Sequence, residues 1–135
     1  MPTSQSEPDW LSADDLAELN ELIVEESEEP FLVLKPNELE SAAQRPRSLY
    51  LYKGVTDIGR LAVRLMVAIS QNHPFEEGNK RTAFIAATIF VEQNGYLYDA
   101  EDDEAFAELL KSVIKREATE EELLQAFSAD LYELV

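Results

Sequence analysis

The chain has 135 residues, of which 45% are hydrophobic and 9% aromatic, so it can bury the core of one ordinary domain. Its 28 acidic and 11 basic residues give a formal charge of -17, which argues against general binding to nucleic acid or to an anionic membrane surface. The absence of cysteine excludes disulfides and fits a reducing compartment, and the longest apolar run is far below the roughly 20 residues of a membrane span. We therefore expect a soluble, cytoplasmic protein.

The charge is distributed unevenly along the chain. Residues 35–81 contain eight bases and five acids, a net charge of +3. The flanking segments, 1–34 and 82–135, together contain 23 acids and three bases, a net charge of -20. An anion is therefore expected to bind to the middle segment. Within it, we expect Arg60 and Arg64 to be solvated bases on a helix surface rather than anion ligands.

The N-terminal part of the sequence predicts a helix followed by an extended segment. We expect residues 1–11 to be flexible and residues 12–135 to form a single domain. Ser12 has the position of an N-cap for an amphipathic helix that reaches about Ser27. Prolines enclose the apolar stretch 30–36, which favours an extended flap, or one strand of a short hairpin, over a helix; a plain connection is the alternative.

Prolines and capping residues also divide the middle of the chain. Asn37 predicts a short helix that ends at about Ala43, because Pro46 disfavours a helical conformation in the residue before it. Residues 47–54 are then expected to be a connection. The next helix is predicted over about 57–71, where apolar residues recur at helical spacing.

The segment Thr82–Val91 is apolar on nearly all sides, which indicates a helix enclosed by its neighbours. We expect this central buried helix to span about 79–93. The pair Asn94–Gly95 is a typical helix stop.

Three further elements are predicted near the C-terminus. A short extended stretch, 96–98, precedes a helix at about 102–115. A capping box that begins at Thr119 then opens a last helix, which we expect to continue to about Leu134. The predicted fold class is therefore all-α, a compact helical bundle around the central helix.

One loop, residues 73–82 (H-P-F-E-E-G-N-K-R-T), has residue choices that packing does not explain. It contains the only histidine of the chain and one of its four glycines. N–H groups at a helix start carry partial positive charge and bind anions, and Gly78 lets the backbone approach a phosphate closely. Lys80 and Arg81 add full positive charges, and the planar guanidinium of Arg81 suits two phosphate oxygens.

Two other side chains of this loop suit chemistry at a phosphate. Glu77 is a candidate ligand for a magnesium ion, because Mg²⁺ binds one or two carboxylates together with phosphate oxygens. His73 is a candidate general base, since an imidazole can take the proton of an attacking hydroxyl near neutral pH. We expect Phe75 to anchor the loop in the core and Glu76 to be an uninvolved surface residue.

The spacing of the loop resembles the signature of the Fic/Doc family, H-x-F-x-[D/E]-[G/A]-N-[G/K]-R, and the likeness covers about residues 12–134. The family implies a Fic/Doc-like helical bundle with ATP as co-substrate and Mg²⁺ as cofactor. Its Doc branch is the better match for two reasons. Fic nucleotidyltransferases have glycine where this chain has Lys80, and a second arginine where this chain has Phe84.

The resemblance implies a role for each residue of the loop. His73 is expected to be the general base, and Arg81 a second catalytic residue. Glu77 is expected to hold the metal. The nucleotide's phosphates are expected to contact Gly78, Asn79, Lys80, Arg81 and Thr82.

By the same resemblance, the protein is expected to be the toxin of a toxin–antitoxin system. A Doc-like enzyme transfers the γ-phosphoryl group of ATP to a Ser/Thr hydroxyl, a threonine of translation elongation factor Tu, and so blocks translation. The alternatives are a Fic-type adenylyltransferase and a catalytically inactive binding protein. The family's self-inhibitory pattern, [S/T]-x-x-x-E-[G/N], does not occur in the sequence, so restraint is expected from an antitoxin docked in a groove between helices.

Overall fold

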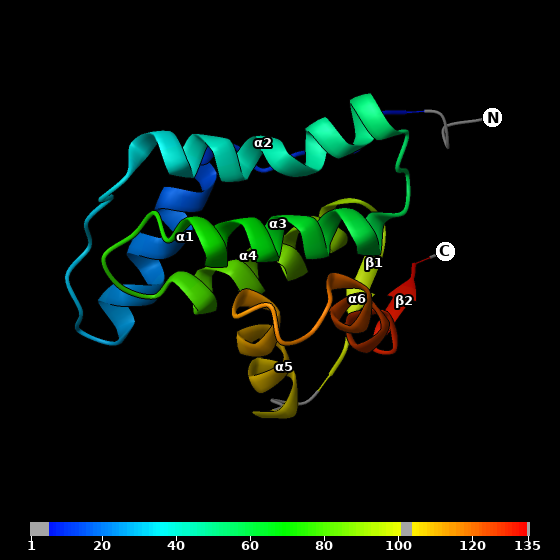
Figure 1. Ribbon diagram of the computed structural model, residues 1–135. Coiled ribbons are helices and arrows are strands. Elements are labelled where there is room, and N and C mark those ends of the chain that lie inside the picture. The colour runs from blue at the N-terminus through cyan, green and yellow to red at the C-terminus, as the bar shows by residue number, and fades with distance from the viewer. Residues whose placement is uncertain (1–5, 101–103, 135) are drawn as a thin grey trace.

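The computed structural model describes residues 6–100 and 104–134, which form six helices and one two-stranded sheet (Figure 1). The helices are α1 (Ala13–Glu26), α2 (Pro36–Lys53), α3 (Ile58–Asn72), α4 (Asn79–Gln93), α5 (Glu104–Ile114) and α6 (Glu120–Ser128). The strands, β1 (Tyr96–Tyr98) and β2 (Leu131–Glu133), pair antiparallel. The predicted all-α class is confirmed. None of the helices in this part of the chain combines the length and hydropathy that a membrane span requires.

Three helices begin at the capping residues that the sequence predicts. The hydroxyl of Ser12 accepts the N–H of Asp15 at 3.1 Å, and the carboxylate of Asp15 accepts the N–H of Ser12 at 2.9 Å. Thr119 caps α6 in the same reciprocal way, and the carboxylate of Asp57 caps α3. These bonds satisfy N–H groups that have no acceptor within the helix, so the starting points follow from local sequence.

Helix α2 differs most from the sequence-based expectation. We predicted a helix over 37–43 and a connection over 47–54, but one continuous helix extends from Pro36 to Lys53 with Pro46 inside it. A proline in a helix interior removes an N–H donor and costs about 3 kcal/mol. Burial against α3 compensates for this cost. The buried face of α2 consists of Leu39, Ala42, Ala43 and Pro46.

The C-terminal end of the chain also differs from the prediction. Helix α6 ends at Ser128 instead of reaching Leu134, and the following residues form β2. Leu97 in β1 lies opposite Tyr132 in β2. This pairing satisfies backbone groups of β1 that a lone strand leaves without partners. Helical periodicity cannot reveal it, because the two strands are far apart in the sequence.

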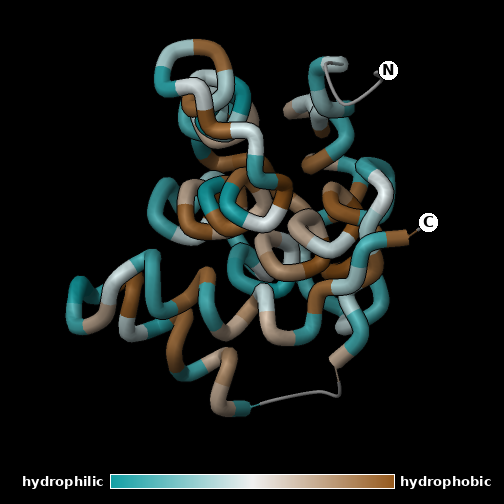
Figure 2. Tube along the Cα trace, turned by 90° about the vertical axis from the view of Figure 1, so that its right-hand side faces the viewer, coloured by the Kyte–Doolittle hydropathy of each residue, from teal (hydrophilic) through white to brown (hydrophobic). Residues whose placement is uncertain are grey.

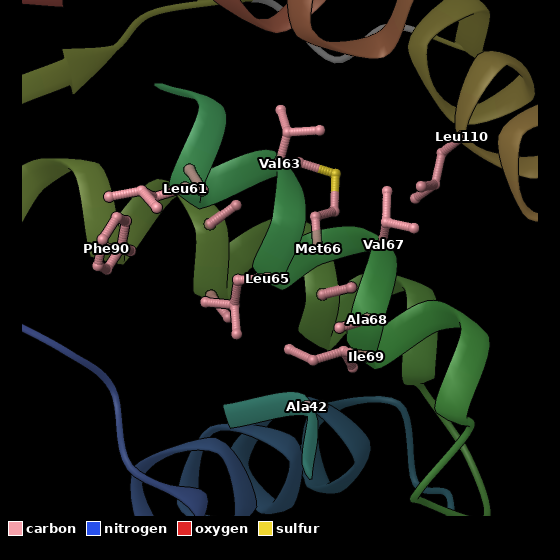
Figure 3. Close-up of a cluster of buried hydrophobic side chains, with 14 of the residues drawn as sticks. Ala42, Leu61, Val63, Leu65, Met66, Val67, Ala68, Ile69, Phe90 and Leu110 are labelled. Atoms are coloured by element: carbon pink, nitrogen blue, oxygen red, sulfur yellow. The ribbon is translucent and has the colours of Figure 1, made fainter. Parts of the chain in front are cut away.

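Helices α3 and α4 share the centre of the bundle. Hydrophobic and hydrophilic residues alternate along the surrounding helices, as Figure 2 shows. The predicted bounds of the central helix, 79–93, agree with α4. Helix α3 nevertheless buries more residues than α4 and contacts α2, α4, α5 and α6. Figure 3 shows Val67 directed toward Leu110 of α5, whereas Leu65 and Ile69 lie on the side of α3 that faces Ala42 of α2.

Residues just before α1 contact the far end of α4. The ring of Trp10 stacks on Phe90 with a centroid separation of 5.7 Å, and the N–H of Asp9 donates to the side chain of Asn94 at 2.8 Å. These contacts tie the start of the described chain to the bundle. The flexibility of residues 1–11 and the extent of the single domain stay predictions.

Candidate active site

The loop between α3 and α4 has its shape fixed by two backbone reversals and one buried ring. His73 ends α3 in a left-handed conformation, with φ 51°, which is uncommon for a residue other than glycine. Gly78 begins α4 in the same region, with φ 75°. Between them, Phe75 is completely buried, as the sequence predicts. The loop is therefore anchored at its middle and turned at both ends.

Asn79 closes this loop on itself. Its buried side-chain oxygen accepts the N–H of Phe75 at 3.0 Å, and its Nδ2 donates to the carbonyl of Phe75 at 2.8 Å. Both ends of the amide are thus engaged. We predicted Asn79 as a phosphate contact, and the group that it can still offer to a phosphate is its backbone N–H at the start of α4.

An extended segment between α1 and α2, residues 32–35, lies against the loop and is called the strap below (Figure 1). The strap and residues 74–76 exchange backbone hydrogen bonds with N···O distances of 2.9 to 3.1 Å. Val33 and Phe75 form an isolated antiparallel bridge. The flap predicted over 30–36 is therefore extended where it pairs with the loop, and it forms no hairpin within the described residues.

The start of α4 carries no side-chain cap, because its N-cap residue is Gly78. The N–H groups of Asn79, Lys80 and Arg81 precede the first helical hydrogen bond. That bond runs from the N–H of Thr82 to the carbonyl of Gly78, at 2.9 Å. An uncapped helix start of this kind attracts an anion through both its N–H groups and the helix dipole.

Thr82 does not share this exposed position. Its side chain is completely buried, and its hydroxyl accepts a hydrogen bond from Nδ2 of Asn20 at 3.0 Å. Its N–H is occupied by the bond to Gly78. We predicted Thr82 as a phosphate contact, but both of its polar groups face the interior, so we remove it from the phosphate site.

Arg81 is held by residues that follow α1. Its Nη2 lies 2.5 Å from Oε1 of Glu29, and its Nη1 donates to the hydroxyl of Ser27 at 3.1 Å. The Ser27 hydroxyl and then the Arg81 guanidinium lower the pKa of Glu29 below its ordinary value. The positive charge of Arg81 is therefore balanced by Glu29.

The other candidate side chains are accessible to substrate. His73 and Lys80 are exposed, and neither makes a side-chain hydrogen bond or ion pair to any residue that the structure describes. Glu77 is half-buried directly before Gly78. A base, a carboxylate and two cations thus lie within one short loop and the first turn of α4.

Glu77 fits the expected magnesium ion as a single protein ligand. Among the described residues, no three histidines, aspartates or glutamates come together as a metal cage. Mg²⁺ does not need one, because it usually combines one or two carboxylates with water and substrate phosphate oxygens. A half-buried carboxylate next to an anion-binding helix start matches that requirement.

A pocket of about 460 Å³ opens beside the start of α4. Three cations, Lys80, Arg81 and Lys111, line it together with apolar residues that include the aromatic rings of Phe84, Tyr98 and Phe106. Its volume lies within the range of roughly 300–1,000 Å³ that is typical of small-molecule pockets. The pocket therefore offers a mainly apolar space with three cations in its lining.

Three residues that contact the loop were not predicted from the sequence: Asn20, Ser27 and Glu29. Asn20 lies between Leu16 and Val24 on the buried face of α1. A polar residue at such a position indicates a buried hydrogen bond, so the sequence does contain a signal for Asn20. No comparable signal marks Ser27 or Glu29, because acidic residues are frequent throughout this part of the chain.

The helical bundle and its loop define the class of this protein. Residues 10–91 match the model of the Fic/DOC family, a match that covers more than half of the chain and includes the complete loop. The protein therefore belongs to the Fic/DOC family.

Within this family, the chain is similar to the protein named "Protein kinase doc" of Escherichia phage P1. The two are 32% identical over 60 residues, which is 44% of this chain and 48% of the relative. The match thus spans about half the length of the relative. Together with the family match, it confirms the predicted resemblance to the Doc branch.

Proposed function

We propose that this protein is a Doc-like toxin that transfers the γ-phosphoryl group of ATP to a Ser/Thr hydroxyl of a target protein. The observation that supports this proposal most is the arrangement of His73, Glu77 and Arg81 around the uncapped start of α4. Phosphoryl transfer depends mainly on positioning and charge neutralisation, and this arrangement supplies both.

In the proposed reaction, the target hydroxyl attacks the γ-phosphorus of ATP. The new bond joins the hydroxyl oxygen to that phosphorus, the bond from phosphorus to the bridging oxygen breaks, and ADP leaves. His73 takes the hydroxyl proton, as its exposed position at the end of α3 allows. The N–H groups at the start of α4 and the side chains of Lys80 and Arg81 hold the phosphate oxygens. Mg²⁺ at Glu77 adds charge neutralisation when it is bound.

The pocket beside Lys80 and Arg81 is the proposed site of the nucleoside part of ATP. An adenine ring is flat and largely apolar on its faces, and Phe84, Tyr98 and Phe106 supply rings for contact. Their position next to the cations allows one nucleotide to occupy the pocket and the helix start together.

The strap is the proposed dock for the target. Its backbone already forms an extended pairing with the loop, and a target peptide can add to such a segment by strand pairing. This places the target hydroxyl beside His73. By family resemblance, the target is a threonine of elongation factor Tu, and phosphorylation there blocks translation in the cytoplasm.

The proposed antitoxin site is a shallow groove of about 300 Å³ between α1 and α4. Leu19, Leu22 and Ile89 line it, and Leu22 is 65% exposed, so the groove offers an apolar surface to a partner helix. An antitoxin that covers this surface supplies the external restraint that the sequence leads us to expect.

Labelled ATP distinguishes this function from its rivals. The protein is incubated with purified elongation factor Tu and Mg-ATP that carries the label on either the α- or the γ-phosphate. We expect γ-label on the target. Label from the α-phosphate indicates adenylylation instead, and no label from either position indicates a binding protein without catalysis.

The His73→Asn variant tests the proposed base. We expect it to lose γ-transfer by at least about 100-fold, because an amide cannot take a proton. Asparagine tolerates the left-handed backbone of this position, so the melting temperature should stay near that of the unaltered protein. His73→Ala is the comparison variant and should lose both activity and some stability. Full activity of either folded variant removes His73 from the mechanism.

A further inference from the structure

Asn20 is a buried polar residue of α1 that bonds to both sides of the loop's glycine. It is only 1% exposed, and its Nδ2 donates to the carbonyl of Glu77 at 2.8 Å and to the hydroxyl of Thr82 at 3.0 Å. One bond thus reaches the residue before Gly78, and the other reaches the first turn of α4. A single side chain connects α1 to both ends of the proposed phosphate site.

The chemistry of its partners determines the orientation of the Asn20 amide. The carbonyl of Glu77 can only accept a hydrogen bond, so the group that faces it must be the NH₂ end. This arrangement leaves the side-chain oxygen of Asn20 buried without a partner in the part of the chain that the structure describes. A buried polar atom without a hydrogen bond is destabilising, and a packing role alone does not require it.

Asn20 also lies directly beneath the backbone reversal at Gly78. A Cβ at Gly78 would lie 3.3 Å from Nδ2 of Asn20 and 3.2 Å from Cγ1 of Val24. Asn20 and Val24 are one helical turn apart on α1, and both are buried. Together they form a surface on which the loop rests, and Asn20 supplies its two hydrogen bonds.

We propose that Asn20 is a positioning residue of the active site. It fixes the backbone of Glu77 and the first turn of α4, and so sets the direction of the Glu77 carboxylate relative to the N–H groups that receive the phosphate. This inference rests on the proposed function for its catalytic consequence. The mechanical part of it, that Asn20 holds the loop in place, can be measured without any activity.

The Asn20→Asp variant is the sharpest test, because it keeps the shape of the side chain and removes both donors. At neutral pH, a carboxylate oxygen then faces the Glu77 carbonyl and repels it. We expect kcat for γ-transfer to fall roughly 10- to 100-fold while KM for ATP changes much less, since a misplaced group lowers the rate more than the affinity.

Amide hydrogen exchange supplies the readout that does not depend on activity. The N–H groups of Glu76 and Thr82 are hydrogen-bonded in the loop, whereas that of Leu123 is bonded within α6. In Asn20→Asp, we expect exchange at Glu76 and Thr82 to accelerate at least about tenfold relative to Leu123. If the aspartate variant does not fold, Asn20→Ala permits the same comparison, because alanine removes the donors without adding a charge.

The matched control is Asn94→Asp at the opposite end of α4. Nδ2 of Asn94 likewise donates two hydrogen bonds, to the backbone carbonyls of Asp9 and Phe90. This variant loses a pair of amide hydrogen bonds far from the loop, so it should leave kcat and the exchange at Thr82 unchanged.

Two outcomes overturn the proposal. One is a folded Asn20 variant with unaltered kcat and unaltered exchange in the loop. The other is an acceleration of exchange at Leu123 equal to that at Glu76 and Thr82, which would make Asn20 a purely structural residue. If the unaltered protein transfers neither label, the proposed function fails, and the exchange experiment alone then decides whether Asn20 holds the loop.

Discussion

At the residue scale, Arg81 connects the proposed phosphate site to the segment that follows α1. Its guanidinium contacts Glu29 and Ser27. The expected phosphate and Glu29 are both anions that interact with the guanidinium of Arg81. We therefore expect Glu29 to compete with a bound nucleotide for this charge.

Replacing Glu29 with glutamine should strengthen nucleotide binding. The neutral amide competes less for Arg81, so we expect the Kd for Mg-ATP, measured by titration calorimetry, to fall roughly two- to fivefold, as suits an exposed ion pair. Glu28→Gln is the control, because it removes the same charge from a neighbouring exposed residue that has no ion pair among the described residues. An equal gain in both variants would mean that only net charge matters.

The same contact gives an expected pH dependence. The pKa of Glu29 is lowered, chiefly by the Ser27 hydroxyl and then by Arg81, so the contact stabilises the folded protein above the ordinary glutamate range and is lost as the pH falls through the lowered pKa. We expect Glu29→Gln to lose less stability than the unaltered protein between neutral pH and about pH 3 in thermal melts. A parallel loss in both proteins would contradict this.

At the scale of elements, α2 shows how packing overrides a local signal. Pro46 lies within the helix and is buried against α3, although its ring removes a hydrogen bond from the helix interior. The residues around it fit a helix, and Gly54 in a left-handed conformation ends that helix. The stability of α2 therefore comes from its buried face more than from its backbone.

Replacing Pro46 with alanine should stabilise the protein. Alanine restores the missing N–H donor and gains up to about 3 kcal/mol of helix propensity, while the smaller side chain loses about 1–2 kcal/mol of buried contact. We expect a net gain of about 1 kcal/mol, seen as a rise of a few degrees in melting temperature. Arg45→Ala, at an exposed position on the same helix, is the control and should change little. A lower melting temperature for Pro46→Ala would show that the ring's packing matters more than the backbone bond.

At the scale of the whole molecule, the basic middle segment and the acidic flanking segments are joined by ion pairs. Four ion pairs of the described residues join bases of the middle segment to acids of the flanks: Arg47–Glu7, Arg60–Glu121, Arg64–Glu120 and Arg81–Glu29. Arg60 and Arg64, expected on a solvated helix face, are exposed and half-buried on α3, and both pair with acids in the first turn of α6.

These ion pairs neutralise only part of the negative charge of the chain. We therefore expect the thermal stability of the protein to depend on the salt concentration. With a formal charge of -17, the folded chain repels itself, and salt screens this repulsion more than it weakens a few exposed ion pairs. We expect the melting temperature to rise between low salt and about 1 M NaCl. Potassium chloride at matched ionic strength is the control for a specific ion effect. An unchanged melting temperature would point instead to a basic partner as the reason for the acidic surface.

Features that depend on neighbouring residues could be predicted from the sequence. The caps at Ser12, Asp57 and Thr119 involve partners three residues away, and the amphipathic helices follow from spacings of three or four. The loop from His73 to Arg81 is predictable for the same reason, since its candidate base, candidate metal ligand and proposed phosphate-binding backbone are close together in the sequence.

The tertiary structure alone decided the features that join distant segments. The bonds of Asn20 to Glu77 and Thr82, the contact of Glu29 with Arg81 and the pairing of the strap with the loop all connect residues that are far apart along the chain. Pro46 inside a helix belongs to the same group, because burial against α3 permits it. The composition and spacing of a segment determine its own conformation, but the partner that satisfies a buried donor or a charge depends on which faces pack together. The sequence by itself therefore determined the family, the loop and most helix starts, whereas packing decided what holds that loop in place.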